Sequence, residues 1–187
     1  PATAAVLALG GQVSNPATPF ANAVFNNFPS TNEVQNYGIS AQADYEAGEF
    51  TLTSITSYRE TKGEFGQDVD FTSLDLLQRF QDQKLNTFTQ EFRVTGELGP
   101  VTMLLGAFYF DESVVENQTV NRGARFFNFA DLSIGGNGTG AAVTNLEGTI
   151  GTLYGNPGQY IGQFFRPGQA ENGRFELTND ALSFFAQ

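Results

Sequence analysis

The 187-residue sequence predicts an all-β fold made of antiparallel strands of a transmembrane β-barrel. Three observations support this fold class. Apolar and polar residues alternate along several segments, short turns and long loops alternate between those segments, and no window shows sustained 3.6-residue periodicity. No apolar run approaches the ~18 residues of a membrane-spanning helix, so only strands closed into a barrel could carry this chain through a bilayer.

The alternation is clearest at the start of the segment Tyr37–Glu60. Successive side chains of a strand face opposite sides of the sheet, so this segment begins with one apolar row and one wholly polar row. A tyrosine stands at each end of the apolar row, which is typical of strands that place aromatic rings at the two interfaces of an outer membrane. The apolar row consists of Tyr37, Ile39, Ala41, Ala43 and Tyr45.

Five strands are expected, and the connections between them alternate in length. The short turns lie at 47–49 and 96–100, and the long loops at about 60–86 and 112–176. Bacterial outer-membrane barrels have this rhythm, with short periplasmic turns and long extracellular loops. Ile55 and Gln90 break the alternation, and a β-bulge would restore it. The expected strands are about 36–46, 50–59, 87–95, 101–111 and 177–187.

Composition excludes several functions. The net charge is -11 and the nine basic residues are scattered, which argues against nucleic-acid binding. The chain has no Cys and no His, so thiol nucleophiles, Cys/His metal sites and histidine acid–base chemistry are absent. No carboxylate pair has the spacing of an acid–base dyad. We therefore expect no catalytic residues, no enzyme activity and no cofactor.

Four stretches, in this order, resemble the central barrel of TonB-dependent outer-membrane receptors, especially those of alphaproteobacteria such as sphingomonads. They are LTSITSYRE (52–60), FGQDVDFTSLDLL (65–77), FTQEFRVTGELGPVTMLLGAFYFDE (88–112) and LTNDALSFFAQ (177–187). Together they cover about a third of the chain. The resemblance implies that residues 1–187 are an internal piece of a 22-stranded barrel in the bacterial outer membrane.

The same resemblance implies the function. Such receptors import scarce nutrients, most often ferric siderophores, with energy that reaches them through TonB. The chain contains no counterpart of the N-terminal plug or of the TonB box, so contact with TonB is expected through a part that precedes this segment. The implied partners are outer-membrane lipid, TonB and a siderophore or other small-molecule ligand.

Aromatic and arginine side chains gather in the longer loop. In a receptor they could cover a ligand, stacking on its rings and pairing with its anionic oxygens. A loop of that length also needs a small core of its own, and the same rings could supply it. The candidate ligand-binding residues are Phe126, Phe127, Phe129, Arg122, Arg125, Tyr154 and Tyr160; Tyr160 is followed by Phe164, Phe165 and Arg166.

Other polar motifs have structural interpretations. Glu91 and Arg93 share the inward face of their strand, where they could form part of a lumenal charge ladder or a simple structural pair. The acidic stretch 64–75 contains Asp68, Asp70 and Asp75 but lacks the pattern of a calcium loop, so we expect turn caps rather than metal. The Gly-rich run 135–140 lacks the Lys-Ser/Thr of a P-loop and predicts a flexible loop tip.

Two alternative functions fit much of the pattern. A secreted or surface β-sandwich with adhesin-like loops would explain the acidity, the Gly- and Asn-rich loops and the doubly apolar strand at 101–111. A passive porin-like channel would share the barrel but need no plug. The sandwich differs from both barrels in one respect, because it covers its apolar face with a second layer of protein.

Overall fold

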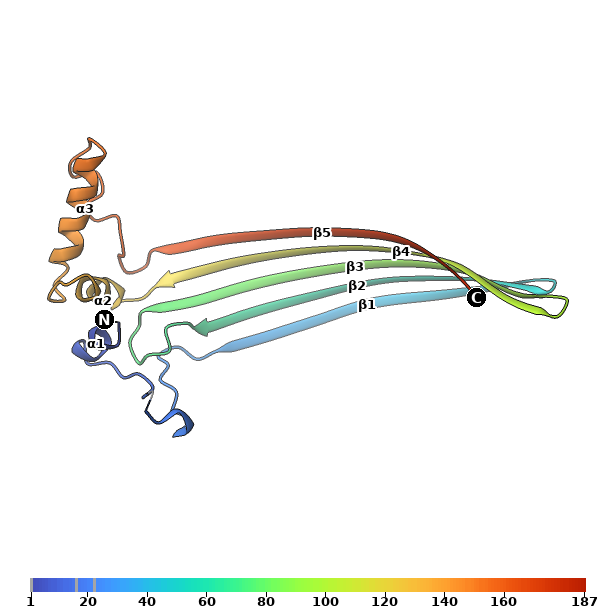
Figure 1. Cartoon of the computed structure of the whole chain (residues 1–187), viewed down its shortest axis with the longest axis horizontal. Coiled ribbons are helices and arrows are strands. Elements are labelled where there is room, and N and C mark those ends of the chain that lie inside the picture. The colour runs from blue at the N-terminus through green and yellow to red at the C-terminus, as the bar shows by residue number, and fades with distance from the viewer. Residues whose placement is uncertain (1, 16, 22) are drawn as a thin grey trace. The chain divides into compact units, whose positions relative to one another are not determined.

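In the computed structural model, which describes residues 2–15, 17–21 and 23–187, the chain forms one five-stranded antiparallel sheet. Figure 1 shows the strands side by side in sequence order. The strands are β1 (Thr31–Ala47), β2 (Phe50–Asp68), β3 (Leu77–Leu98), β4 (Val101–Arg122) and β5 (Ala170–Ala186). The helices are α1 (Ala2–Ala8), the short 3₁₀ helix η1 (Pro19–Ala21), α2 (Phe126–Ser133) and α3 (Ala141–Leu153).

The strands are longer than predicted, and both predicted loops are correspondingly shorter. Residues 60–68 and 77–86, expected in a loop, are strand, so the β2–β3 connection is only 69–76. These strand ends carry polar side chains on both faces, which hides the alternation in the sequence. Cross-strand pairs stabilise them instead: Glu60 on β2 accepts from Lys84 on β3 at 2.9 Å.

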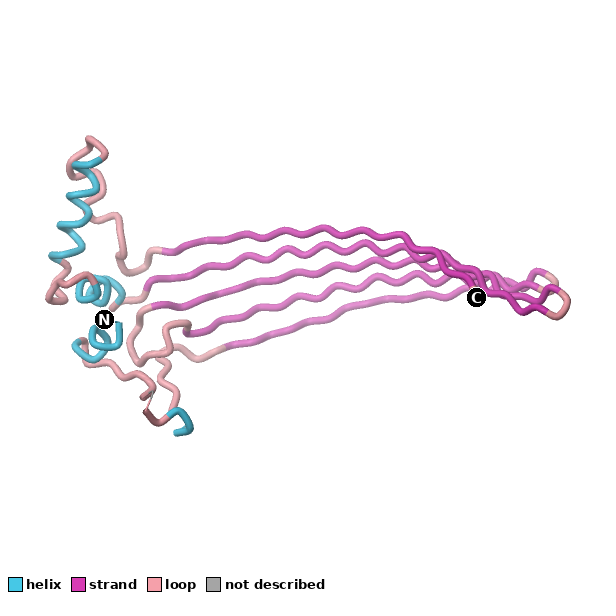
Figure 2. The backbone as a smooth tube through the Cα atoms, in the orientation of Figure 1, coloured by secondary structure: helices cyan, strands magenta, loops and turns pink. Residues whose placement is uncertain are grey.

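The predicted loop 112–176 is mostly regular structure. Its first part continues β4 to Arg122, its last part begins β5 at Ala170, and the connection between them contains α2 and α3 (Figure 2). α1 packs against α2, and α2 packs against α3. No described helix has the length and apolar character needed to cross a bilayer.

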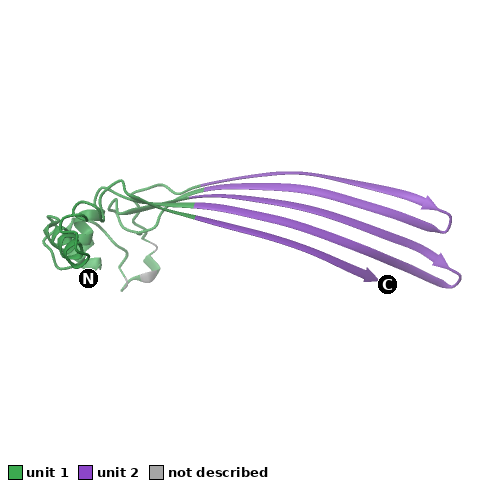
Figure 3. Cartoon of the chain, turned by 90° about the horizontal axis from the view of Figure 1, so that it is seen from above, with its two compact units in different colours: residues 1–31, 65–80, 118–173 green, residues 32–64, 81–117, 174–187 purple. Residues whose placement is uncertain are grey.

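The chain divides into two compact units, which Figure 3 colours separately. Unit 1 comprises residues 1–31, 65–80 and 118–173, and unit 2 comprises residues 32–64, 81–117 and 174–187. Unit 1 contains the helices and a small apolar core. That core is formed by Val6, Leu74 and Leu76, with Leu9, Val13, Leu77, Phe126 and Phe129 packed against it.

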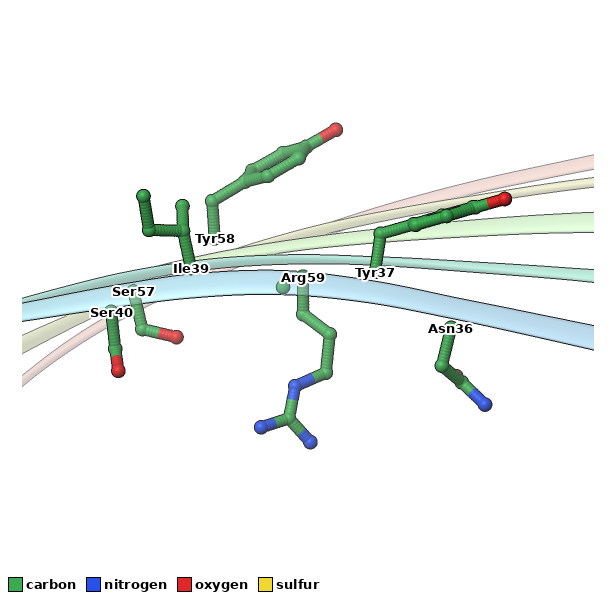
Figure 4. Close-up of a pocket in the computed structure, with 8 residues that line it drawn as sticks. Asn36, Tyr37, Ile39, Ser40, Ser57, Tyr58 and Arg59 are labelled. Atoms are coloured by element: carbon green, nitrogen blue, oxygen red, sulfur yellow. The ribbon is translucent and has the colours of Figure 1, made fainter.

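The two faces of the sheet have opposite chemistry. Figure 4 shows Tyr37, Ile39 and Tyr58 projecting from one face of β1 and β2, and Asn36, Ser40, Ser57 and Arg59 from the other. We call the first the apolar face; it carries the odd-numbered residues of β1 and β4 and the even-numbered residues of β2, β3 and β5. We call the second the polar face.

The register is constant along the strands, so the predicted bulges do not occur. Between β2 and β3, Gly66 lies against Phe80 near one end, and Gly96 lies against Phe50 near the other. Gln90 therefore stays on the apolar face, where its side chain accepts from Thr56 Oγ1 at 2.5 Å and donates to Ser54 Oγ at 3.1 Å. Hydrogen bonds among Gln90, Thr56 and Ser54, rather than a bulge, therefore accommodate a polar side chain on the apolar face.

An apolar band occupies the apolar face beside the two hairpin turns. Its residues are exposed: Ile39 is 75 % and Phe92 56 % accessible. An aromatic row, Tyr37, Tyr58, Phe88 and Tyr109, marks its border away from the turns; Phe88 and Tyr109 have ring centroids 6.3 Å apart. The band consists of Tyr37, Ile39, Ala41, Ala43, Tyr45, Phe50, Leu52, Tyr58, Phe88, Phe92, Val94, Leu98, Val101, Met103, Leu105, Ala107, Tyr109, Leu182, Phe184 and Ala186.

Beyond the aromatic row the apolar face becomes charged. Glu60 forms ion pairs with both Lys62 (3.0 Å) and Lys84 (2.9 Å), and Arg174 pairs with Glu176 on β5. The first residue of this face beyond the row is charged on β2 (Glu60) and β4 (Asp111), about 7 Å along the strand, and is an amide on β1 (Gln35) and β3 (Asn86). The same face thus has an apolar zone and a strongly hydrated zone with a sharp border.

One glycine on the polar face makes room for an aromatic ring. A Cβ at Gly106 on β4 would lie 2.2 Å from the Phe185 ring on β5, whereas a Cβ at Gly173 would meet no atom within 4 Å. Covering a strand glycine with a neighbouring aromatic ring is a known way to compensate for its missing side chain.

We predict that Gly106→Ala destabilises the sheet by about 1–3 kcal/mol, because overpacking displaces the Phe185 ring. Gly173→Ala is the matched control and should change the free energy of unfolding by less than about 0.5 kcal/mol. Denaturant titration of the protein measures both. Equal effects of the two substitutions would contradict the proposed packing.

Candidate ligand-binding site

A cavity of about 230 Å³ lies within unit 1, at the ends of β3, β4 and β5. The strand residues that line it belong to the polar face, and two phenylalanines from the β4–β5 connection complete it. Its lining is Leu77, Val120, Arg122, Phe126, Phe165 and Glu171.

Arg122 is the cationic group of this cavity. Its Nη2 donates to Glu171 Oε1, and the centre of its guanidinium lies 5.8 Å from the centroid of the Phe126 ring. The Arg122 side chain is only 17 % exposed, whereas that of Glu171 is 71 % exposed. An exposed carboxylate is a weakly held partner. An anionic ligand group could therefore replace Glu171 and form a bidentate contact with the guanidinium.

Asp75 fixes the backbone that leads from β4 into α2. Its Oδ2 accepts from the Ala124 N–H at 2.8 Å, and its backbone carbonyl accepts from the Arg125 N–H at 2.9 Å. A Cβ at Gly123 would lie 2.2 Å from Asp75 Oδ1, so this close approach requires glycine. The position of Phe126 beside Arg122 depends on this junction.

The aromatic residues of the connection form a continuous series of ring contacts. Phe126 lies 6.2 Å from Phe129 and 6.0 Å from Phe165 (centroid distances), and Phe165 in turn lies 6.3 Å from Phe164. Tyr160 stacks on Phe164 at 5.7 Å and contacts Tyr154 at 6.4 Å. Ring contacts of this kind are expected of a small core within the connection. Contact of these rings with a ligand stays a prediction.

The remaining two candidates lie in other surroundings. The Phe127 ring lies under the guanidinium of Arg166, 3.9 Å from centroid to Cζ, in a cation–π contact. Arg125 is exposed just before α2 and contributes its backbone N–H to Asp75. The structure thus brings Arg122, Phe126 and Phe129 together and leaves Phe127 and Arg125 outside that cluster.

Glu147 on α3 holds the segment that follows the helix. Its fully buried carboxylate accepts from the backbone N–H groups of Gly162 (2.9 Å) and Phe164 (2.8 Å), and from Arg166 Nη2 (2.7 Å). A buried carboxylate with three donors is well compensated for its loss of water. This carboxylate orders the segment that carries Phe164 and Phe165.

Asp131 joins α2 to the start of α3. Its carboxylate is fully buried and accepts from the N–H groups of Ala142 (2.7 Å), Val143 (3.2 Å) and Gly138 (2.8 Å). It therefore caps the N-terminus of α3 from a distant position in the chain. Burial alone would raise the pKa of Asp131, but the backbone donors outweigh burial and lower that pKa below the ordinary 3.8.

The Gly-rich run 135–140 forms an ordered part of this cap. A Cβ at Gly136 would lie 2.2 Å from the Asp131 carboxylate. A Cβ at Gly140, whose φ is +91°, would lie 2.0 Å from the Phe127 ring. These close approaches account for the glycines, and the expected flexible loop tip is replaced by a tightly packed turn.

The acidic stretch also consists of backbone caps. Asp68 Oδ1 accepts from the N–H groups of Asp70 (3.0 Å) and Phe71 (3.2 Å), and its Oδ2 accepts from that of Asn27 (3.0 Å). Asp68 is buried, and these backbone donors satisfy its carboxylate. Among the described residues, no group of three or more Cys, His, Asp or Glu side chains is arranged to hold a metal ion.

Glu91 and Arg93 form an ion pair on the polar face of β3, as their spacing predicted. Both belong to unit 2. Whether the pair faces an enclosed lumen stays a prediction.

A hollow of about 540 Å³ around Gly38 on β1 and β2 does not form one binding site. Its lining includes Tyr37 on the apolar face and Arg59 on the polar face, which project from opposite sides of the sheet (Figure 4). A ligand on one side cannot contact both.

Sequence reasoning named Phe165 among the loop aromatics but missed three residues of this region: Glu171, Asp131 and Glu147. One signal was available for the last of them. Glu147 is the only charged residue between Asp131 and Arg166, and a lone charge in a neutral helix needs a partner when it is buried. Glu171 gave no such signal, because its pairing with Arg122 depends on strand register.

Comparison of the chain with protein-family models, with curated proteins and with solved structures finds no match.

We predict that Asp131→Ala uncaps α3 and costs about 1–3 kcal/mol of local stability, because three backbone donors lose their acceptor. Since the folded-state pKa is lowered, this stabilisation is present above the ordinary value of 3.8 and is lost as the pH falls through the lowered pKa. Hydrogen exchange at the Ala142 and Val143 amides measures the effect.

The matched control is Asn145→Ala, an exposed position on the same helix. It should leave the exchange of both amides unchanged within about 0.5 kcal/mol. Protection in Asp131→Ala equal to that of the parent protein would refute the cap.

Proposed function

We propose that this chain is a segment of a TonB-dependent outer-membrane receptor, an energy-coupled transporter that imports a scarce nutrient. The observation that carries the proposal is the exposed apolar band, confined to one face of the sheet and bordered by aromatic rings. A soluble sheet would expose its polar residues and cover such a band. Among the described residues, none covers Ile39 or Phe92 enough to remove it from solvent.

The height of the band fits a bilayer. Tyr45 lies eight positions after Tyr37 on β1, and Tyr109 lies eight positions after Val101 on β4. At about 3.3 Å per residue this is about 26 Å along the strand, or about 20 Å along the membrane normal at a tilt of about 40°. The apolar band of outer-membrane barrels is about 25 Å tall, and rings border it on both sides.

The lengths of the connections between the strands also support a membrane-spanning sheet. The turns at one end contain Gly48 and Gly99, both with positive φ, and each joins its strands through two residues. At the other end of the strands lies the 47-residue connection 123–169 with its two helices. In outer-membrane barrels short turns are periplasmic and long connections extracellular. The charged zone beyond the aromatic row then lies in the headgroup region or in water.

The cavity around Arg122 supports a role in ligand capture. Its strand lining belongs to the polar face, which in a closed barrel would face the lumen, and it lies at the strand ends next to the long connection. A guanidinium beside two phenyl rings suits an anionic, partly aromatic ligand. A ferric siderophore is the cargo that the sequence resemblance implies, and TonB would act through a part of the protein outside this segment.

Cysteine labelling tests the topology, and the chain itself has no cysteine. In a cysteine-free full-length protein we predict that Gln159→Cys reacts with a membrane-impermeant maleimide on intact cells. Glu49→Cys, at the β1–β2 turn, should react only after the outer membrane is permeabilised. The reverse pattern would overturn the orientation, and labelling of both on intact cells would overturn the membrane location.

A second prediction tests contact with lipid. Ala41→Arg places a charge in the middle of the apolar band and should cost about 2–4 kcal/mol in a bilayer. Gln42→Arg, on the polar face of the same strand, should cost less than about 0.5 kcal/mol. Reversible unfolding of the full-length protein in phospholipid vesicles measures both free energies. Equal costs at the two positions would remove the argument for lipid contact.

A further inference from the structure

A second cavity, of about 290 Å³, lies in unit 1 between α1, the 70–77 segment and α2. Its walls are mainly aliphatic and aromatic, with Val6, Leu76 and Phe129 from the small core among them. A cavity of about 150 Å³ already holds a benzene ring. The volume here therefore suits one ring with a short side chain.

The Asp70 carboxylate forms the polar part of this cavity. Its Oδ1 accepts from the N–H (2.9 Å) and the hydroxyl (2.6 Å) of Thr72, and its Oδ2 accepts from the Leu77 N–H (2.8 Å). A carboxylate oxygen can accept two hydrogen bonds, so Oδ2 retains one free acceptor position. Burial raises the pKa of Asp70, with smaller opposing contributions from these donors.

The carboxylates next to the cavity have no cationic partner. Among the described residues, no Lys or Arg side chain lies within 4.0 Å of a carboxylate oxygen of Asp68 or Asp70. The lining of the cavity also contains no basic residue. Asp70 is half-buried and its donors are neutral backbone and hydroxyl groups, so its negative charge is free to attract a cationic ligand group.

Phe71 is held in a strained conformation at the cavity. Its φ is +54°, and its side chain is 64 % exposed although it lines an apolar cavity. The carboxylates of Asp68 and Asp70 enforce this conformation by accepting from three successive N–H groups, those of residues 70, 71 and 72. Bulky residues with positive φ cost about 1–3 kcal/mol and concentrate at ligand-binding positions.

We propose that this cavity binds a small arylalkyl amine, with the ring among the apolar side chains and the ammonium on Asp70 Oδ2. The volume and the apolar lining favour an aromatic ring in the ligand. The Asp70 carboxylate, which has no cationic partner among the described residues, favours a positively charged group. This site carries the negative charge of Asp70, whereas the Arg122 cavity carries a positive charge and suits anions. Phe126 lines both cavities, so the two sites share one wall.

The probe for the test is 2-phenylethylamine, with 2-phenylethanol as its neutral counterpart. On the full-length protein in detergent at neutral pH, titration calorimetry should show the amine binding roughly tenfold or more tightly than the alcohol, since a charge-assisted hydrogen bond is worth about 1.5–3 kcal/mol. Binding of the amine should weaken as the pH falls through the raised pKa of Asp70, because the protonated carboxyl no longer attracts ammonium.

Two variants locate the site. Asp70→Asn should remove the preference for the amine. Thr3→Phe, which projects a ring from α1 into the cavity, should abolish binding of both probes, while Leu7→Phe on an exposed position of the same helix should leave it unchanged.

Three results would overturn the proposal: no saturable binding of the amine, equal binding of amine and alcohol, or an intact preference in Asp70→Asn. Because the measurement is made in detergent and requires no import, its failure is distinct from failure of the receptor function. If Asp70→Asn does not fold, the comparison of Thr3→Phe with Leu7→Phe still decides the location.

Discussion

The rest of the structure depends on one constraint, which is that a single sheet layer carries a broad apolar band that the described residues leave exposed. Main-chain pairing across five strands satisfies the backbone, but it leaves side chains such as Ile39 in contact with solvent. The apolar band therefore needs an apolar neighbour. The proposed bilayer would supply one and would also account for the aromatic row and for the charged residues beyond it. Neither feature is required for packing against a second protein layer.

Unit 1 is stabilised in a different way. Its apolar core is small, and the long connections are ordered by buried carboxylates that accept backbone N–H groups. Asp131 caps α3, and Glu147 binds the backbone of the segment that follows α3. Asp68 binds the backbone of the turn after β2 in the same way. Each carboxylate accepts several backbone N–H groups that would otherwise bind water. These connections are therefore ordered although they bury few apolar residues. A connection built in this way can keep a water-facing surface.

The sequence predicted the antiparallel all-β sheet and the alternation of β1 well, because period-2 patterning reflects a local property of the strand. Strand ends were missed where both faces are polar, since pairs such as Glu60 with Lys84 become visible only when the register is known. For the ligand site, aromatic and arginine content pointed to Arg122 and Phe126. Glu171 reaches the same cavity through the pairing of β4 with β5, which the composition of the sequence does not reveal.

The net charge of -11 follows from this division of roles. Six of the nine basic side chains are engaged in ion pairs, while the caps of unit 1 use carboxylates that need backbone N–H groups rather than cations. Acidic residues therefore accumulate without neutralising partners, and the resulting field repels anions. An anionic ligand would bind such a segment only where a guanidinium is locally concentrated and shielded from water. Arg122, mostly buried beside Phe126 and paired with an exposed carboxylate, meets that requirement, whereas the cavity beside Asp70 attracts the opposite charge.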